Sequence, residues 1–170
     1  MPETPAPDAF RADLAACLHV ARFVDDVAAG APYDSFDALR TAASASAARL
    51  DAAEVDEALA SHPRIGERPT GEGAAQSFSR AEQASADASD EDLARAIADG
   101  NRAYEERFGR VFLIRAAGRS RAEILSELRR RLELDDASEL ETVADQLAQI
   151  ALLRLEQLYG GASAPIGAAA

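Results

Sequence analysis

Helix signals follow one another along almost the whole chain, and they limit the fold more than any other feature of the sequence. Apolar residues recur at helical spacing, and capping residues or glycines stand at the ends of these segments. The expected helices cover about residues 8–21, 35–50, 51–61, 89–108, 124–134 and 138–159, with a turn or short helix at 23–28 and another short helix that begins at Ser79. The pattern therefore predicts an all-α fold.

One short segment does not fit a helix. Val111, Phe112, Leu113 and Ile114 form a compact β-prone run, but the chain offers no second strand candidate to pair with it. We expect a buried extended connector near residues 111–117 rather than a strand of a sheet. The prediction is a single-domain bundle of seven or eight helices that contains this connector.

The length of the chain fits one domain. A chain of 170 residues can bury a sizeable core, and no internal repeat or change of composition marks a boundary within it. We expect a single domain spanning residues 1–170, with a folded part of about 8–160 and a frayed tail at 161–170.

Charge and cysteine content exclude several classes of partner and site. The net charge of −12 argues against binding to nucleic acid or to an anionic membrane, because both need a basic face. The single cysteine, Cys17, rules out an internal disulfide, and we expect it to be a buried core residue. No run of about 18 apolar residues is present, and the N-terminus lacks the features of a signal peptide. We therefore expect a cytoplasmic protein that does not span a membrane.

The first candidate for chemistry is His62, which stands before Pro63 at the end of an expected helix. His62 is one of two histidines in the chain. Because proline disfavours the helical conformation of the residue before it, the imidazole should project from a helix-to-loop junction. An imidazole can exchange a proton near neutral pH. A histidine at a helix end can also simply complement the helix dipole, so both interpretations stay open.

The second candidate is the helix start at residues 79–83. It places the hydroxyl of Ser79, the carboxylate of Glu82 and the carboxamide of Gln83 close together. Ser-x-x-Glu is also the spacing of a capping box, which recurs at Ser120 and Glu123. Glu82 is therefore either a reacting carboxylate or a structural cap.

Other charged and polar residues have simpler interpretations. The two histidines are isolated and no chelating spacing surrounds them, so no metal site is expected. Arg129, Arg130 and Arg131 should form a solvated helix face that pairs with nearby glutamates. The segment 64–77 contains several glycines and prolines and is expected to be a long loop.

Taken together and in order, the motifs resemble those of the 2-oxo-4-hydroxy-4-carboxy-5-ureidoimidazoline (OHCU) decarboxylase family of urate degradation. They are His62-Pro63-Arg64-Ile65-Gly66; Ser79-x-x-Glu82-Gln83-Ala84; Asn101-x-x-Tyr104-x-x-Arg107-Phe108-Gly109-x-x-Phe112-Leu113-Ile114; Gly118-Arg119-Ser120; and Leu152-Leu153-Arg154-Leu155. The resemblance covers roughly Phe10 to Tyr159.

The resemblance implies a fold, a reaction and a set of site residues. The family fold is all-α and usually homodimeric, and the reaction converts the small molecule OHCU to (S)-allantoin without a cofactor or metal. His62 matches the proton donor, Glu82 the second catalytic group, and Pro63 a ligand contact. The remaining substrate-binding matches are Ser79, Arg80, Ala81, Gln83, Ile114, Arg115, Ala116, Ala117, Gly118 and Arg154.

Two positions depart from the family pattern. Arg64-Ile65 stands where many members carry Asp-Leu, and Arg110 occupies a position that is often apolar or aromatic. Neither departure touches the matched acid and base. The alternative to a decarboxylase is a non-catalytic all-α interaction or dimerisation module, in which Glu82 only caps a helix and His62 only ends one.

Overall fold

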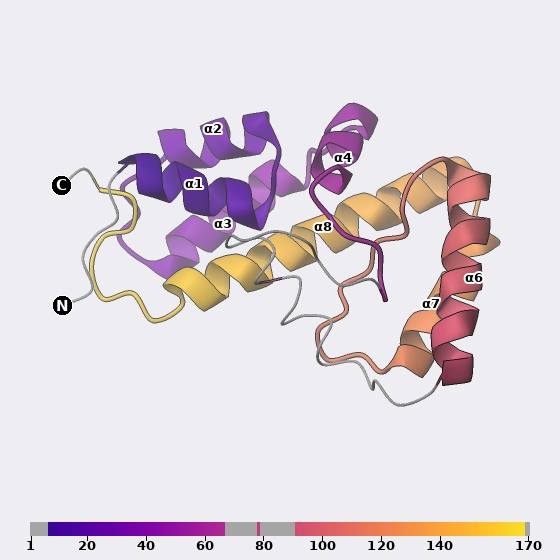
Figure 1. Ribbon diagram of the computed structural model, residues 1–170. Helices are drawn as coiled ribbons and strands as arrows, with labels where there is room; N and C mark the ends of the chain where they lie inside the picture. Colours follow the sequence, from indigo (N-terminus) through magenta and orange to yellow (C-terminus); the bar gives the residue numbers. More distant parts are fainter. Residues whose placement is uncertain (1–6, 67–77, 79–90, 169–170) are drawn as a thin grey trace. The chain divides into compact units, whose positions relative to one another are not determined.

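The computed structural model describes residues 7–66, 78 and 91–168 of the chain. Within these residues the chain forms seven helices and no strand, which confirms the all-α prediction (Figure 1). The helices are α1 (Pro7–Cys17), α2 (Ala21–Ala29), α3 (Phe36–Ala47), α4 (Ala52–Leu59), α6 (Glu91–Phe108), α7 (Arg121–Leu132) and α8 (Asp136–Tyr159).

The chain divides into two compact units. The first consists of Met1–Ala58 and Leu147–Ala170, and the second of Leu59–Gln146. Helix α8 therefore contributes its N-terminal half to the second unit and its C-terminal half to the first. The expectation of one domain spanning 1–170 stays a prediction.

Helix starts in the first unit follow the capping residues of the sequence. The side chain of Ser35 accepts a hydrogen bond from the backbone of Ala38 and caps α3, as expected. Asp51 and Glu54 each accept a bond from the other's backbone N–H, at 2.9 and 3.0 Å, which is the reciprocal arrangement of a capping box. Local signals thus set the beginnings of α3 and α4.

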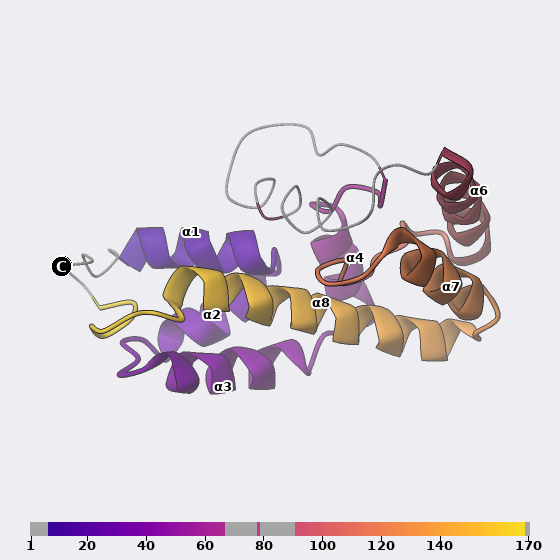
Figure 2. The ribbon, with the colours of Figure 1, turned by 90° about the horizontal axis from the view of Figure 1, so that it is seen from below.

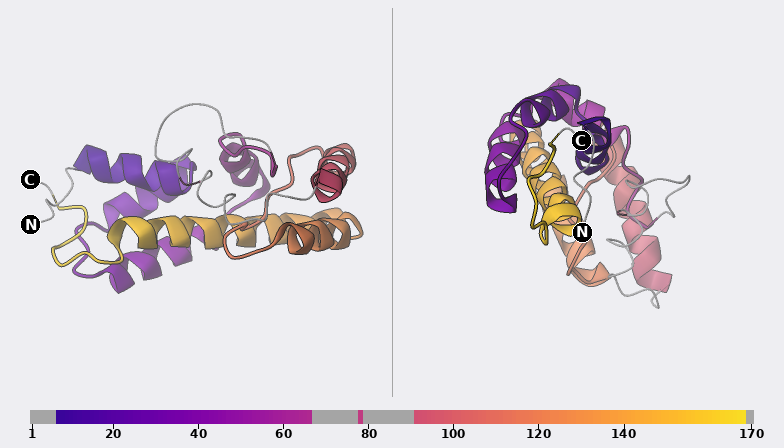
Figure 3. Two further views of the ribbon diagram at one scale, coloured as in Figure 1. Left: turned by 60° about the horizontal axis from the view of Figure 1, so that its bottom comes forward. Right: turned by 90° about the vertical axis from the view of Figure 1, so that its left-hand side faces the viewer.

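The core of the first unit lies between α1, α2, α3 and the C-terminal half of α8. Figures 2 and 3 show α1 and α3 running alongside that half of α8. The side chains of Leu14, Phe23, Leu39 and Leu155 are almost completely buried there, and so is Cys17, as expected.

The expected first helix over 8–21 is too long at its C-terminal end. Helix α1 ends at Cys17, and Val20 then takes an extended backbone conformation with φ −133° and ψ 119°. Leu18 and Val20 are both buried. The break therefore lets two neighbouring apolar side chains enter the core before α2 begins at Ala21.

The tail is also ordered further than the sequence indicated, and the expectation of fraying is wrong at Ile166 and Gly167. The backbone of Ile166 exchanges hydrogen bonds of 2.9 and 2.8 Å with Tyr33, and its side chain is buried. Gly167 has φ +77° and passes so close to the ring of Phe10 that an added Cβ would lie 2.7 Å from it. Side-chain burial and backbone pairing hold this stretch.

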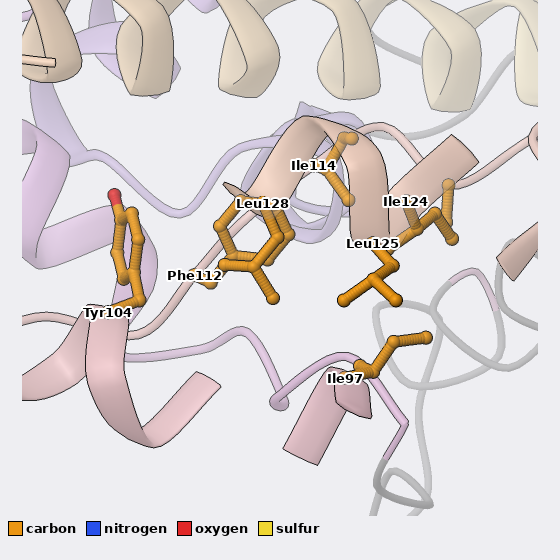
Figure 4. Close-up of a cluster of buried hydrophobic side chains, with 8 residues drawn as sticks. Ile97, Tyr104, Phe112, Ile114, Ile124, Leu125 and Leu128 are labelled. Carbon is orange, nitrogen blue, oxygen red and sulfur yellow. The ribbon is translucent and has the colours of Figure 1, made fainter. Parts of the chain in front are cut away.

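The second unit is built around α6, α7 and the expected connector. Phe112, Leu113, Ile114 and Ala116 are buried in a non-helical segment, which confirms the buried connector near 111–117. Figure 4 shows Phe112 and Ile114 among the side chains of Ile97, Tyr104, Ile124, Leu125 and Leu128. The connector is therefore a central part of this core.

Arg131 corrects the expectation of a solvated arginine face on α7. Its neighbour Arg130 does pair with Glu127 near the surface, but Arg131 is fully buried. Its guanidinium donates to the fully buried carboxylate of Glu139 at 2.9 Å and to the carbonyl of Leu113 at 2.7 Å. The position continues the apolar face of Ile124 and Leu128, so it points into the core.

Candidate active site

His62 lies where the sequence places it, just beyond the last turn of α4. Helix α4 ends at Leu59, and the backbone N–H of His62 donates to the carbonyl of Leu59 at 3.0 Å. The side chains of His62 and Pro63 are half-buried. The helix-to-loop junction is therefore confirmed, and it leaves the imidazole within reach of solvent.

The turn that follows His62 is attached to α6 at two points. Arg64 donates to both carboxylate oxygens of Glu105, at 2.5 and 2.8 Å. These bonds hold the pKa of Glu105 below its ordinary value. The side-chain nitrogen of Asn101 donates to the carbonyl of Ile65 at 2.8 Å. Gly66 completes the turn with φ +89°, a conformation that favours glycine.

The connector that carries residues 114–118 is also held on more than one side. Arg131 donates to the carbonyl of Leu113 at 2.7 Å, and the backbone N–H of Arg115 donates to the side chain of Gln146 at 2.9 Å. A turn closes the segment through a 3.0 Å bond from the N–H of Arg119 to the carbonyl of Ala116. The backbone of this segment therefore has a defined orientation.

A cavity of about 430 Å³ joins these two segments within the second unit. Its apolar wall includes Ile97 and Ile124, and its polar groups include Asn101 and Glu105. The full lining consists of Arg64, Ile65, Gly66, Ala94, Ile97, Ala98, Asn101, Arg102, Glu105, Ala116, Arg121 and Ile124. A mixed lining of apolar walls with a few charged groups suits a small polar molecule.

The structure brings together only some of the residues that the sequence singled out. Ala116 and the turn after Pro63 share the cavity, whereas His62 is not part of its lining. Arg154 belongs to the first unit, where its buried side chain donates to the carbonyl of Ala16 at 3.1 Å. The candidates Ser79, Arg80, Ala81, Glu82 and Gln83 lie outside the described residues, as do residues 67–77, where the sequence predicted most of a long loop.

Sequence reasoning assigned no positioning role to the residues that hold the two segments in place, although it included Asn101 in one of the motifs. Asn101, Glu105, Arg131 and Gln146 all make this kind of contact. For Asn101 a signal was present, because it is a polar residue that follows Ile97 by one helical turn on a face that also buries Tyr104. A polar residue within an apolar stripe needs a partner.

Two further findings concern metal ions and membranes. The described part of the chain contains no group of three or more histidine, cysteine, aspartate or glutamate side chains that could hold a metal ion. Of the helices that the structure describes, none has the length and apolar character needed to cross a membrane.

Sequence comparisons match the chain to one family model and to several relatives. The family model described as OHCU decarboxylase matches residues 4–156. The chain is 31% identical over 147 residues to the uric acid degradation bifunctional protein TTL of Arabidopsis thaliana, which is 84% of this chain and 45% of the relative. It is 35% identical over 107 residues to the 2-oxo-4-hydroxy-4-carboxy-5-ureidoimidazoline decarboxylase of Mus musculus, covering 62% of this chain and 60% of the relative. The Haloferax volcanii protein of the same name is 30% identical over 132 residues, covering 75% of each chain.

The chain thus spans about half the length of the Arabidopsis relative and 60% of the mouse relative. Among solved structures, an OHCU decarboxylase crystallised in the presence of (S)-allantoin superposes with a TM-score of 0.72 at 26% identity, covering 87% of this chain and 97% of the other. An (S)-allantoin synthase gives a TM-score of 0.63 at 16% identity over 90% of this chain and 50% of the other, which indicates a shared fold.

Proposed function

The chain belongs to the OHCU decarboxylase family, and we therefore propose that it is a carbon–carbon lyase that converts OHCU to (S)-allantoin. The observation that carries the proposal is the family match over residues 4–156. The sequence resemblance implies that His62 is the proton donor, and the position of His62 at a helix-to-loop junction supports this role. The cavity beside this junction supports a small-molecule substrate.

The chemistry of the substrate explains why the reaction needs little from the protein. Cleavage of the carbon–carbon bond to the carboxylate releases carbon dioxide and leaves an electron pair on a ring carbon. The adjacent imidazoline π-system can delocalise that pair, so no pyridoxal or thiamine group is needed as an electron sink. The pair forms a ring C=C bond and displaces the electrons of the ring C=N bond onto its nitrogen, which takes up a proton. The hydroxyl on the carbon that lost the carboxylate then gives up its proton and becomes the carbonyl of allantoin, while the neighbouring ring carbon, which bears the ureido group, takes up a proton on one face. This last protonation sets the configuration of the product.

Each matched residue has a proposed role in this sequence. His62 delivers the proton to the ring carbon that bears the ureido group, and general acid catalysis of this kind contributes about 10²–10⁴-fold in rate. Glu82 orients the substrate hydroxyl or the imidazole, and Gln83 binds the ureido group. Backbone groups of residues 114–118 line the substrate, and Arg154 pairs with an anionic group. The fixed connector supports this role, because binding groups act best when they are held in place.

We also propose that the protein is a cytoplasmic homodimer, as the sequence resemblance implies. Light scattering at micromolar concentration should give about twice the 17.9 kDa mass of one chain. A scattering mass that equals one chain would contradict the dimer and leave the decarboxylase proposal standing.

A coupled assay tests the proposed reaction. The protein is added to freshly generated OHCU, and the loss of the ultraviolet and circular-dichroism signals of OHCU is followed. We expect loss well above the rate in buffer. Decay of OHCU at the buffer rate would instead support a non-catalytic helical module.

A further inference from the structure

We propose that Asn101 is a positioning residue that holds the imidazole of His62 in its reactive orientation, with Glu105 as its companion one turn further along α6. The inference rests on the proposed function, in which His62 donates the proton. Neither Asn101 nor Glu105 needs to touch the reacting atoms for this role.

The backbone around His62 is held on both sides. On the N-terminal side, the N–H of His62 itself donates to Leu59 at 3.0 Å. On the C-terminal side, Asn101 donates to the carbonyl of Ile65 at 2.8 Å. Pro63, between these points, has a fixed φ and removes most of the remaining freedom. Because so few rotatable bonds lie between the two attachments, a change at Ile65 is transmitted to the backbone of His62.

The environment of Asn101 shows that its polarity serves this bond. Asn101 is buried at 6% exposure on a face of α6 that also carries Ile97 and Tyr104. Its side-chain oxygen is buried and has no hydrogen-bond partner among the described residues. A buried oxygen without a hydrogen-bond partner costs stability, and an apolar side chain of similar size would avoid this cost. An apolar side chain could not, however, donate a hydrogen bond to the carbonyl of Ile65.

Glu105 adds a second attachment of a different kind. It lies four residues after Asn101, so both side chains leave the same face of α6. Its carboxylate accepts two hydrogen bonds from Arg64, the residue between Pro63 and Ile65. A two-bond contact between arginine and carboxylate restrains direction as well as distance. The turn after His62 is therefore held to α6 by one neutral bond and one charged pair.

The test uses Asn101→Asp and Asn101→Leu, which both remove the donor while keeping the size of the side chain. We expect kcat for OHCU to fall about 10- to 100-fold, because small misplacements of a catalytic group have effects of this order. Asn101 also lines the cavity, so the positioning role requires that the fall in kcat exceed any rise in KM. A raised KM with unchanged kcat would overturn the inference and make Asn101 a binding residue.

An independent readout does not require activity. The chain has two histidines, so the imidazole NMR spectrum contains signals from His62 and from exposed His19 only. The two Asn101 variants should shift the signals of His62 and leave those of His19, which belongs to the other unit, in place. Unmoved His62 signals would overturn the inference. Because this result is obtained even if the wild type fails to decarboxylate OHCU, it separates failure of the inference from failure of the proposed function.

A charge-matched pair of variants tests Glu105. Glu105→Gln and Asp92→Asn each remove one carboxylate charge from α6, but Asp92 pairs with the exposed Arg95, and neither of these two residues lines the cavity. Glu105→Gln should shift the His62 signals and lower kcat, whereas Asp92→Asn should do neither. Equal effects of the two variants would show that only the charge of α6 matters, and would contradict the positioning role of Glu105.

Discussion

The buried pair of Arg131 and Glu139 gives the sharpest test of how the connector is held. Both side chains are completely inaccessible to solvent. The guanidinium of Arg131 also donates to Leu113 and lies 4.6 Å from the ring centre of Phe112. Replacing Arg131 by Met keeps a long apolar side chain but removes every one of these polar contacts. The variant therefore isolates the electrostatic part of the arrangement.

The size of the effect follows from what the substitution leaves behind. Removing one partner of a buried ion pair costs about 3–5 kcal/mol, because the other charge stays buried without compensation. In Arg131→Met, Glu139 retains the hydroxyl of Tyr104 as a donor. Burial and this bond to Glu139 raise the pKa of Tyr104, so it remains a neutral hydroxyl. We expect the free energy of unfolding to fall by about 3–5 kcal/mol.

Urea unfolding followed by far-ultraviolet circular dichroism measures this change, since the chain is helical and has no tryptophan. The matched control is Arg130→Met at the adjacent position, where the pair with Glu127 is partly exposed and is worth about 0–1 kcal/mol. Adding Glu139→Leu to Arg131→Met should recover part of the loss, because it removes the uncompensated charge. A loss for Arg131→Met no larger than that for Arg130→Met would refute the reasoning.

Three further predictions concern catalysis and pH. His62→Asn should give a folded protein with kcat lowered at least about 100-fold, and near-normal turnover would leave His62 as a helix terminator. Glu82→Gln should stop turnover with little change in the urea midpoint, because glutamine can still cap; Glu123→Gln, at a capping box that the structure confirms, should change neither. If the two variants behave alike, the catalytic role of Glu82 is wrong. Hydrogen bonds from Arg22 hold the pKa of Glu54 below its ordinary value. The contribution of Glu54 to stability is therefore fully present above the ordinary pKa of a glutamate and is lost as the pH falls through the lowered pKa. Urea unfolding at a series of pH values should show less acid sensitivity in Glu54→Gln, and unchanged sensitivity would contradict this.

The parts of the fold that could be predicted from the sequence depend mostly on residues that are close together in the chain. The caps at Ser35, Asp51 and Ser120 involve residues three positions apart, so the spacing alone identifies them. Helix ends at glycine are equally local: Gly109 has φ +70° and follows α6 directly. The junction at His62 was predictable for the same reason, because proline acts on the residue before it.

Long-range contacts account for what the sequence did not indicate. The burial of Arg131 depends on Glu139, which comes from the next helix. Ile166 pairs with Tyr33, far away in the chain. Asn101 binds Ile65 across 36 positions. A polar side chain at a helical position can face solvent or a distant partner, and periodicity alone does not distinguish the two.

The configuration of the allantoin product tests the central claim most directly. Protonation of a planar, delocalised intermediate in free solution can occur on either face, whereas a fixed imidazole delivers the proton to one face. Circular dichroism of the product formed from fresh OHCU should therefore show (S)-allantoin in excess with the wild-type protein, formed faster than in buffer. Racemic allantoin formed at the buffer rate would contradict the account.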